Sequence, residues 1–135
     1  MKNFILLTCI LVCLFLLNCS KNEEDLFNIL TGHTWKTDSL LANGMDAGGP
    51  GQLLEKFKGE AKFNKDATGN FGKFTGSWWF TENRTQIIIK TDSLPLPLTS
   101  KIIELNESSF KITTAVPDKT NPLVEVKIRM TFKPK

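Results

Sequence analysis

Residues 124–133 constrain the fold of this chain more than any other segment, because five apolar side chains alternate there with five polar ones. Successive side chains of a β-strand point to opposite faces. A period of two therefore predicts a strand with one buried face and one face in water. We expect this strand to belong to a sheet whose apolar face lies against the core.

Shorter segments of the same kind recur upstream, and turn-forming residues separate them. We expect strands over residues 33–41, 59–64, 71–74, 76–81, 85–91, 101–105 and 110–113, in addition to 124–133. About seven or eight short strands with turn signals every 8 to 12 residues predict an all-β fold, an antiparallel up-and-down β-barrel. A β-sandwich is the alternative for this spacing.

Three connecting segments differ from the strands in composition. Residues 52–58 predict at most a turn or two of helix, and residues 94–98 contain Pro95 and Pro97. Proline has no N–H to donate to a central strand ladder, so we expect a loop over 94–98. Residues 43–51 are rich in glycine and are either a mobile loop over an open end of the barrel or a plain connection.

The N-terminal segment predicts export. One basic side chain, Lys2, precedes an apolar run over residues 4–17, which is the layout of a secretory signal peptide. A helix of about 14 residues rises only about 21 Å, less than the roughly 30 Å of a bilayer core. We therefore assign residues 1–18 to a signal peptide, residues 19–29 to a tether and residues 30–135 to the β-domain.

Leu16, Leu17, Asn18 and Cys19 resemble the lipobox of bacterial lipoproteins, in which the cysteine is acylated and the preceding peptide is removed. Asn18 replaces the usual small residue, as in lipoproteins of the Bacteroidota, which this chain also resembles in its 15 lysines against 2 arginines. The resemblance implies a palmitate-type lipid anchor at Cys19. It also implies the outer membrane, because Ser20 stands where an aspartate would retain the protein in the inner membrane. A secreted protein cleaved near the same place is the alternative.

The acidic cluster of Glu23, Glu24 and Asp25 follows the predicted anchor. It resembles the export tag that carries Bacteroidota lipoproteins to the cell surface, which implies surface display. The alternative is a solvated tether, because a short charged run cannot pack against a core.

Composition argues against an enzyme, a metal site or a cofactor. Cys9 and Cys13 lie in the predicted signal peptide, and His33 is the only histidine. No pair of carboxylates has a spacing that would place both on one buried face, so we expect His33 to be a surface residue. With 17 basic and 14 acidic side chains and no basic stripe, the chain is not expected to bind nucleic acid.

Several short motifs follow one another along the predicted β-domain. They cover residues 30–35, 63–66 with Gly69, 76–78, 87–89, 102–105 and 110–112. In this order they resemble the small lipocalin-like domain found in many Bacteroidota lipoproteins. The resemblance places Gly32 and Trp35 at the start of the first strand, separated by two residues instead of the one that lipocalins have. It also implies that Arg129, from the last strand, stacks on the Trp35 indole as a cation–π contact.

An eight-stranded barrel has room either for its own side chains or for one small molecule. The residues expected to point inward are bulky: Phe63, Phe71, Phe74, Trp78 or Trp79, Phe80, Phe110, Val124, Val126, Ile128, Met130 and Phe132. They predict a largely filled core. Adjacent strand residues point to opposite faces, so one of Trp78 and Trp79 should be buried and the other should lie outside. The outer one is a candidate partner contact unless a loop or the tether covers it, and Trp35 and Arg129 complete the set of candidate ligand or partner contacts.

Two short motifs suggest a modification of the exported protein. Asp38-Ser39-Leu40 and Asp92-Ser93-Leu94 resemble the O-glycosylation motif of exported Bacteroidota proteins, which implies modification of Ser39 and Ser93.

The sequence as a whole predicts a membrane-anchored lipoprotein whose domain binds a small apolar ligand. The alternative is a structural or protein-interaction module of the cell envelope that binds no ligand. A cavity on the order of several hundred Å³ would favour the first, and a solid core with an exposed aromatic patch would favour the second.

Overall fold

The computed structural model describes residues 21–135, so the predicted signal peptide and the predicted lipid anchor at Cys19 lie outside the described residues. The chain forms one helix, one 3₁₀ turn and nine strands in this part. In chain order these elements are α2 (Lys21–Gly32), β1 (Thr34–Ala42), β2 (Met45–Asp46), η1 (Glu55–Phe57), β3 (Glu60–Phe63), β4 (Thr68–Phe71), β5 (Phe74–Phe80), β6 (Gln86–Thr91), β7 (Leu98–Asn106), β8 (Ser109–Pro117) and β9 (Glu125–Pro134).

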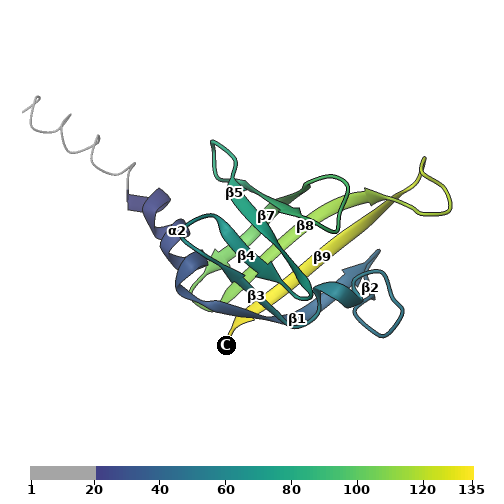
Figure 1. Ribbon diagram of the computed structural model, residues 1–135, viewed down its shortest axis with the longest axis horizontal. Helices are drawn as coiled ribbons and strands as arrows, with labels where there is room; N and C mark the ends of the chain where they lie inside the picture. Colours follow the sequence, from purple (N-terminus) through teal and green to yellow (C-terminus); the bar gives the residue numbers. More distant parts are fainter. Residues whose placement is uncertain (1–20) are drawn as a thin grey trace, which may run out of the picture.

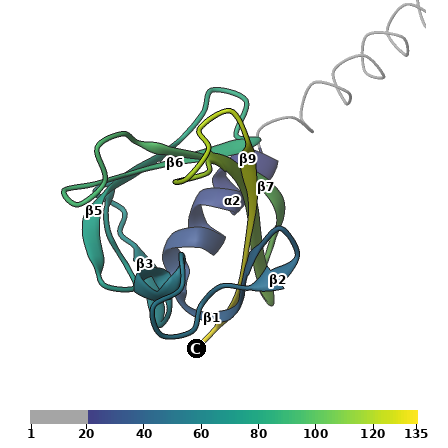
Figure 2. The same cartoon turned by 90° about the vertical axis from the view of Figure 1, so that its right-hand side faces the viewer.

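Eight of the strands close into an antiparallel barrel. The order is β1, β3, β4, β5, β6, β7, β8 and β9, and β9 pairs back with β1 (Figures 1 and 2). The two-residue strand β2 pairs only with β1, as an addition outside the closed ring. The prediction of an all-β up-and-down barrel is therefore confirmed, and the sandwich alternative is wrong. The shape is compatible with a lipocalin-like fold.

The strand predicted over residues 71–74 is wrong. Phe71 ends β4 and Phe74 begins β5, and the two residues are paired across a turn made by Gly72 and Lys73. Both phenylalanines are buried in the core. Residues three apart in one strand would point to opposite faces, so only a turn between them can bury both. Gly72 has φ of +61°, and a Cβ there would lie 2.3 Å from the Lys56 carbonyl oxygen.

Other boundaries differ from the predictions in smaller ways. Val124, expected to point inward, precedes β9 and is 50% exposed. The loop predicted over residues 94–98 is confirmed up to Pro97, because β7 begins at Leu98. The predicted helical turn within residues 52–58 is the single 3₁₀ turn η1.

The predicted tether is largely a helix. We assigned residues 19–29 to a tether, with a solvated run as the alternative to an export tag, but residues 21–32 form α2, which lies across one end of the ring of strands (Figure 2). Phe27, Leu30 and Thr31 occur at the spacing of one helical face, and Leu30 and Thr31 are buried. The acidic start of the segment concealed this apolar stripe. No helix within residues 21–135 has the length and apolar character needed to cross a membrane.

Two side chains hold the C-terminal end of α2 on the barrel. The indole Nε1 of Trp35 donates a hydrogen bond to the Leu30 carbonyl at 3.0 Å. The Lys62 ammonium donates to the carbonyl oxygens of Thr31 at 3.1 Å and of His33 at 3.0 Å. The last carbonyls of a helix have no partner within it, and a cation there also complements the helix dipole. β1 and β3 thus supply the partners that the end of α2 lacks.

The predicted stacking of Arg129 on Trp35 is wrong. In the ladder between β1 and β9, Trp35 is paired with Pro134, whereas Arg129 is paired with Leu41. The five residue steps from Arg129 to Pro134 span roughly 17 Å at about 3.3 Å per residue. Arg129 also points outward, between the buried Ile128 and Met130. The rings nearest Trp35 are His33 at 5.3 Å and Phe110 at 5.6 Å between centroids.

The two bonds from Lys62 generate a prediction for stability. Replacing Lys62 by methionine keeps an unbranched side chain, one atom shorter, but leaves the carbonyls of Thr31 and His33 without their donor. We expect the free energy of unfolding in urea to fall by about 1–2 kcal/mol. The control is Lys65→Met in the exposed turn after β3, which should change it by less than about 0.5 kcal/mol. Equal effects of the two substitutions would contradict this role of Lys62.

Candidate binding site at the mouth of the barrel

The two ends of the barrel are built differently. At one end, which we call the helix end, α2 covers the strands beside the short turns β3–β4, β5–β6 and β7–β8. At the other end, which we call the mouth, four connections meet, over residues 43–59, 72–73, 92–97 and 118–124. The β8–β9 connection extends beyond the mouth on the side opposite α2 (Figure 1).

The interior between these ends is filled by side chains. Phe63 lies at its centre and contacts the rings of Phe71, Trp78 and Phe110 at centroid distances of 5.2, 5.4 and 5.7 Å. Only about 10 Å³ is unoccupied among these core rings and their neighbours, which is at most the space of one water molecule. The core around Phe63 is therefore largely filled, as predicted, and leaves no space there for a ligand.

A larger cavity of about 540 Å³ opens at the mouth. Apolar side chains make most of its lining: Leu53, Leu54, Phe57, Phe74, Leu94, Leu98, Val116, Ile128 and Met130. Polar side chains line it as well, among them Gln52, Glu55, Lys56, Ser93, Thr114 and Lys119. Ligand sites in proteins are typically concave, mostly apolar and about 300–1,000 Å³ in volume. The mouth cavity has these properties.

The cavity has three walls that are distant in sequence. Residues 51–57 form one wall, and the second half of β8 with Ile128 and Met130 of β9 forms another. The third is the β6–β7 connection with the start of β7. Part of the glycine-rich segment is therefore at the mouth, where Gly51 lines the cavity. Ala47 and Gly48, in the same segment, are buried against the barrel.

Two buried hydroxyls, those of Thr91 and Ser100, have no hydrogen-bond partner among residues 21–135, and neither residue lines this cavity. Thr91, 4% exposed, follows Ile87 and Ile89 on the inner face of β6. It is paired with Gly76 of β5, two residues from Phe74, a side chain that lines the cavity. Among residues 21–135, no group forms a hydrogen bond with Thr91 Oγ1. A buried polar atom without a partner lowers stability.

The two neighbouring tryptophans point to opposite faces, as predicted. Trp78 is buried, stacks on Phe27 of α2 at 5.8 Å and donates Nε1 hydrogen bonds to the carbonyls of Asn64 and Thr68. Trp79 is 41% exposed on the outer face of β5. Trp78 therefore closes the helix end, and Trp79 is the member of the pair that a partner could contact.

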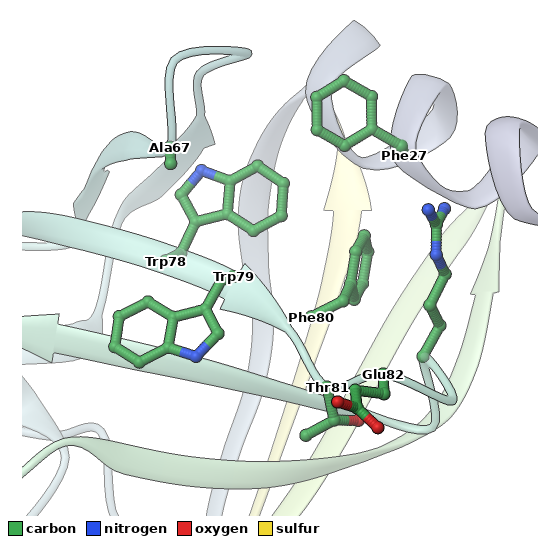
Figure 3. A pocket seen from close by; sticks show the side chains of 8 residues that line it. Phe27, Ala67, Trp78, Trp79, Phe80, Thr81 and Glu82 are labelled. Atoms are coloured by element: carbon green, nitrogen blue, oxygen red, sulfur yellow. The ribbon is translucent and has the colours of Figure 1, made fainter.

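A shallow pocket of about 360 Å³ lies beside these residues at the helix end (Figure 3). Figure 3 shows Trp78 and Phe80 on one side of β5 and Trp79 and Thr81 on the other. The Arg84 guanidinium lies 6.0 Å from the centre of the Phe80 ring. Four aromatic side chains line this pocket, namely Phe27, Trp78, Trp79 and Phe80. The buried Trp78 ring is already covered by Phe27.

The other predicted site residues are dispersed. Trp35 is fully buried under α2 and lines no cavity described here. Arg129 lies on the outer wall, where it borders a groove with Leu41 and Asn43. Ser39 is half-buried within β1, opposite Thr131, whereas Ser93 is exposed in the β6–β7 connection and lines the mouth cavity. The structure therefore brings only Ser93, among the predicted residues, to the mouth.

The titratable groups form no catalytic arrangement that we can identify in the described part of the chain. The only histidine, His33, is partly exposed and pairs through Nε2 with Glu107 at 2.7 Å. No three His, Cys, Asp or Glu side chains within residues 21–135 are grouped so that they could hold a metal ion. The pKa values of Asp66, Glu104 and Asp118 lie below the ordinary carboxyl value, chiefly because the hydroxyls of Thr68, Ser109 and Thr120 donate to them. These bonds stabilise the turns at neutral pH and are lost on acidification through the lowered pKa values.

Because the buried Thr91 hydroxyl has no hydrogen-bond partner among residues 21–135, we predict that removing it will not lower the free energy of unfolding. Thr91→Val replaces it by a methyl group of similar size, and we expect the free energy of unfolding to stay constant or to rise by up to about 1 kcal/mol. The same substitution at Thr37 should lower it by about 1 kcal/mol, because Thr37 Oγ1 donates to the Gly59 carbonyl at 2.9 Å. Urea unfolding of both variants measures the difference. A clear loss of stability in Thr91→Val would contradict the assignment of an unsatisfied hydroxyl.

Comparison with known proteins adds no relative from which a role could be transferred. No protein-family model matches the chain, and no curated protein sequence matches it. The closed antiparallel barrel and its mouth cavity are therefore the observations from which a function has to be argued.

Proposed function

We propose that this protein is a lipoprotein of the outer membrane, anchored through Cys19 and displayed at the cell surface, whose lipocalin-like barrel binds a small apolar molecule at its mouth. The anchor is proposed from the sequence around Cys19. The position of α2 supports it, because this helix begins two residues after Cys19 and covers the helix end. An anchor at that end leaves the mouth facing away from the membrane.

The mouth cavity is the observation that carries the ligand proposal. It is larger by far than the unoccupied space within the barrel, about 540 Å³ against about 10 Å³. Its apolar floor would hold the ligand by removing both surfaces from water, at roughly 25 cal/mol per Å² of apolar area. Because the interior is filled, the ligand lies at the rim of the core and stays partly accessible.

Fluorescence of an apolar probe, N-phenyl-1-naphthylamine, tests the proposal. We expect the intact chain to enhance the emission of the probe, and Val116→Phe to weaken binding at least about tenfold, equivalent to 1.4 kcal/mol, because Val116 lines the cavity. Ala115→Phe is the matched control, since Ala115 is the exposed neighbour on the same strand. Failure of the intact chain to bind, or equal effects of the two substitutions, would contradict the proposal.

The second candidate is a structural or interaction module of the envelope that binds no ligand. The exposed indole of Trp79 favours it, because tryptophan is enriched among residues that dominate protein interfaces. This candidate gains support if the intact chain does not bind the probe. A substitution of Trp79 should leave probe binding unchanged in either case, since Trp79 does not line the mouth cavity.

O-glycosylation remains a proposal for Ser39 and Ser93. A transferase requires access to the hydroxyl, and Ser93 is exposed in a loop whereas Ser39 is half-buried within β1. We therefore place any sugar on Ser93. The intact mass of the native protein tests this, and a mass without any increment beyond the lipid would reject it.

A further inference from the structure

The ladder between β7 and β8 stops before either strand does. These strands are neighbours in the ring (Figure 1), and their last paired residues toward the mouth are Lys101 and Thr113. Beyond that pair, residues 98–100 of β7 and residues 114–117 of β8 continue as strands. Each extension stays paired on its other side, the first with β6 and the second with β9. The barrel wall is therefore split at the mouth, between two strands that are otherwise held in the sheet.

The mouth cavity lies at this split. Leu98 lines it from β7, and Thr114, Val116 and Pro117 line it from β8. All four residues lie beyond the last paired residues of the ladder. If the ladder continued in its register, Leu98 and Val116 would be directly opposed, with Cα atoms about 4.5 Å apart. Their side chains would then meet across space that is now open, so the cavity depends on the separation of the two strands.

Two prolines explain why the ladder does not continue. Backbone groups of an antiparallel strand point alternately to its two neighbours. The N–H of Asp118 donates to a carbonyl on the β9 side of the β8–β9 connection, so the odd-numbered residues of β8 direct their groups toward β7. In the continued register, Ala115 would face Thr99, and Pro117 would face Pro97. Proline has no N–H, so the second of these pairs can form no backbone hydrogen bond.

A side chain takes part of the one backbone pair that the prolines leave possible. The Thr114 hydroxyl donates to the Thr99 carbonyl oxygen at 2.7 Å, which is the acceptor that the Ala115 N–H would use in a continued ladder. Ser100, which would face Thr114 there, is fully buried, and its hydroxyl has no hydrogen-bond partner among residues 21–135. The two strands are therefore linked by a side chain where their backbone ladder has ended.

We propose that Pro97 and Pro117 are positioning residues of the mouth site, which hold β7 and β8 apart so that the ligand lies in the split between Leu98 and Val116. The proposal rests on the proposed function, because it assigns residues to the same cavity. The split lowers stability, since a continued ladder would add backbone hydrogen bonds. A local departure from the most stable arrangement that also creates a cavity is typical of a functional site.

Amide hydrogen exchange tests the split without any ligand. In the full chain we expect the Ala115 amide to exchange at least about tenfold faster than the Thr113 amide, because only Thr113 is in the ladder. Pro97→Val combined with Pro117→Val supplies the missing N–H groups. This double variant should slow the exchange of Ala115, and weaken binding of N-phenyl-1-naphthylamine, each at least about tenfold. Pro95→Val is the matched control, since Pro95 is exposed in the same connection and would face a position beyond the end of β8.

A disulfide closes the split without replacing any residue that lines the cavity. Thr99→Cys combined with Ala115→Cys places two thiols at opposed positions, where the Cα atoms of a ladder are about 5.5 Å apart, within the range of a disulfide. We expect the oxidised form to bind the probe at least about tenfold more weakly than the reduced form. Lys101→Cys combined with Thr113→Cys is the matched control, because this pair is already joined in the ladder and does not line the cavity. Oxidation of the control should leave probe binding unchanged.

The outcomes separate this proposal from the proposed function. Failure of the intact chain to bind the probe would contradict the proposed function, whereas the exchange rates would still decide whether the wall is split. An Ala115 amide as protected as that of Thr113 would overturn the role of the prolines. Equal probe binding by the oxidised and reduced forms of the Thr99 and Ala115 variant would overturn it as well, and so would equal effects of the double proline variant and Pro95→Val.

Discussion

The backbone ladder between β1 and β9 closes the sheet, and the width of the barrel follows from that closure. An open sheet would leave two edges of unpaired N–H and C=O groups, whereas a closed one satisfies both. Eight strands enclose a space just wide enough for side chains. In this chain aromatic rings occupy it, with Phe63 among three of them. Closure thus determines both the solid interior and the need for any ligand to lie at an end.

The two ends differ because only one of them has a helix to cover it. Trp35 and Lys62 satisfy the last carbonyls of α2, and Phe27 covers the indole of Trp78. These contacts bury Leu30, Trp35 and Trp78 at the helix end. The mouth has only loops to cover it, and loops between antiparallel strands pack less closely than a helix laid across them. The cavity and most of the exposed leucines are therefore found at this end.

The sequence predicted those strands in which apolar and polar residues alternate without interruption. Residues 124–133 alternate over ten positions, and their burial alternates as expected at every position except Val124 and Thr131. β4 was misplaced because Gly69 and Gly72 obscure the alternation around Phe71. α2 was missed because its acidic first turn concealed the spacing of Phe27 and Leu30. The mouth cavity could not be predicted at all, since its lining comes from segments more than 70 residues apart.

The attachment of α2 also decides how the domain would respond to mechanical tension on its N-terminus. Force applied ahead of Lys21 is transmitted along α2 to its last turn, where the Trp35 indole and the Lys62 ammonium hold the carbonyls. These side chains belong to β1 and β3, which are neighbours in the ring, and β1 is also paired with β9. The tension is thereby divided among three strands before it reaches the mouth. A domain attached in this way resists being pulled open at the end where it is held.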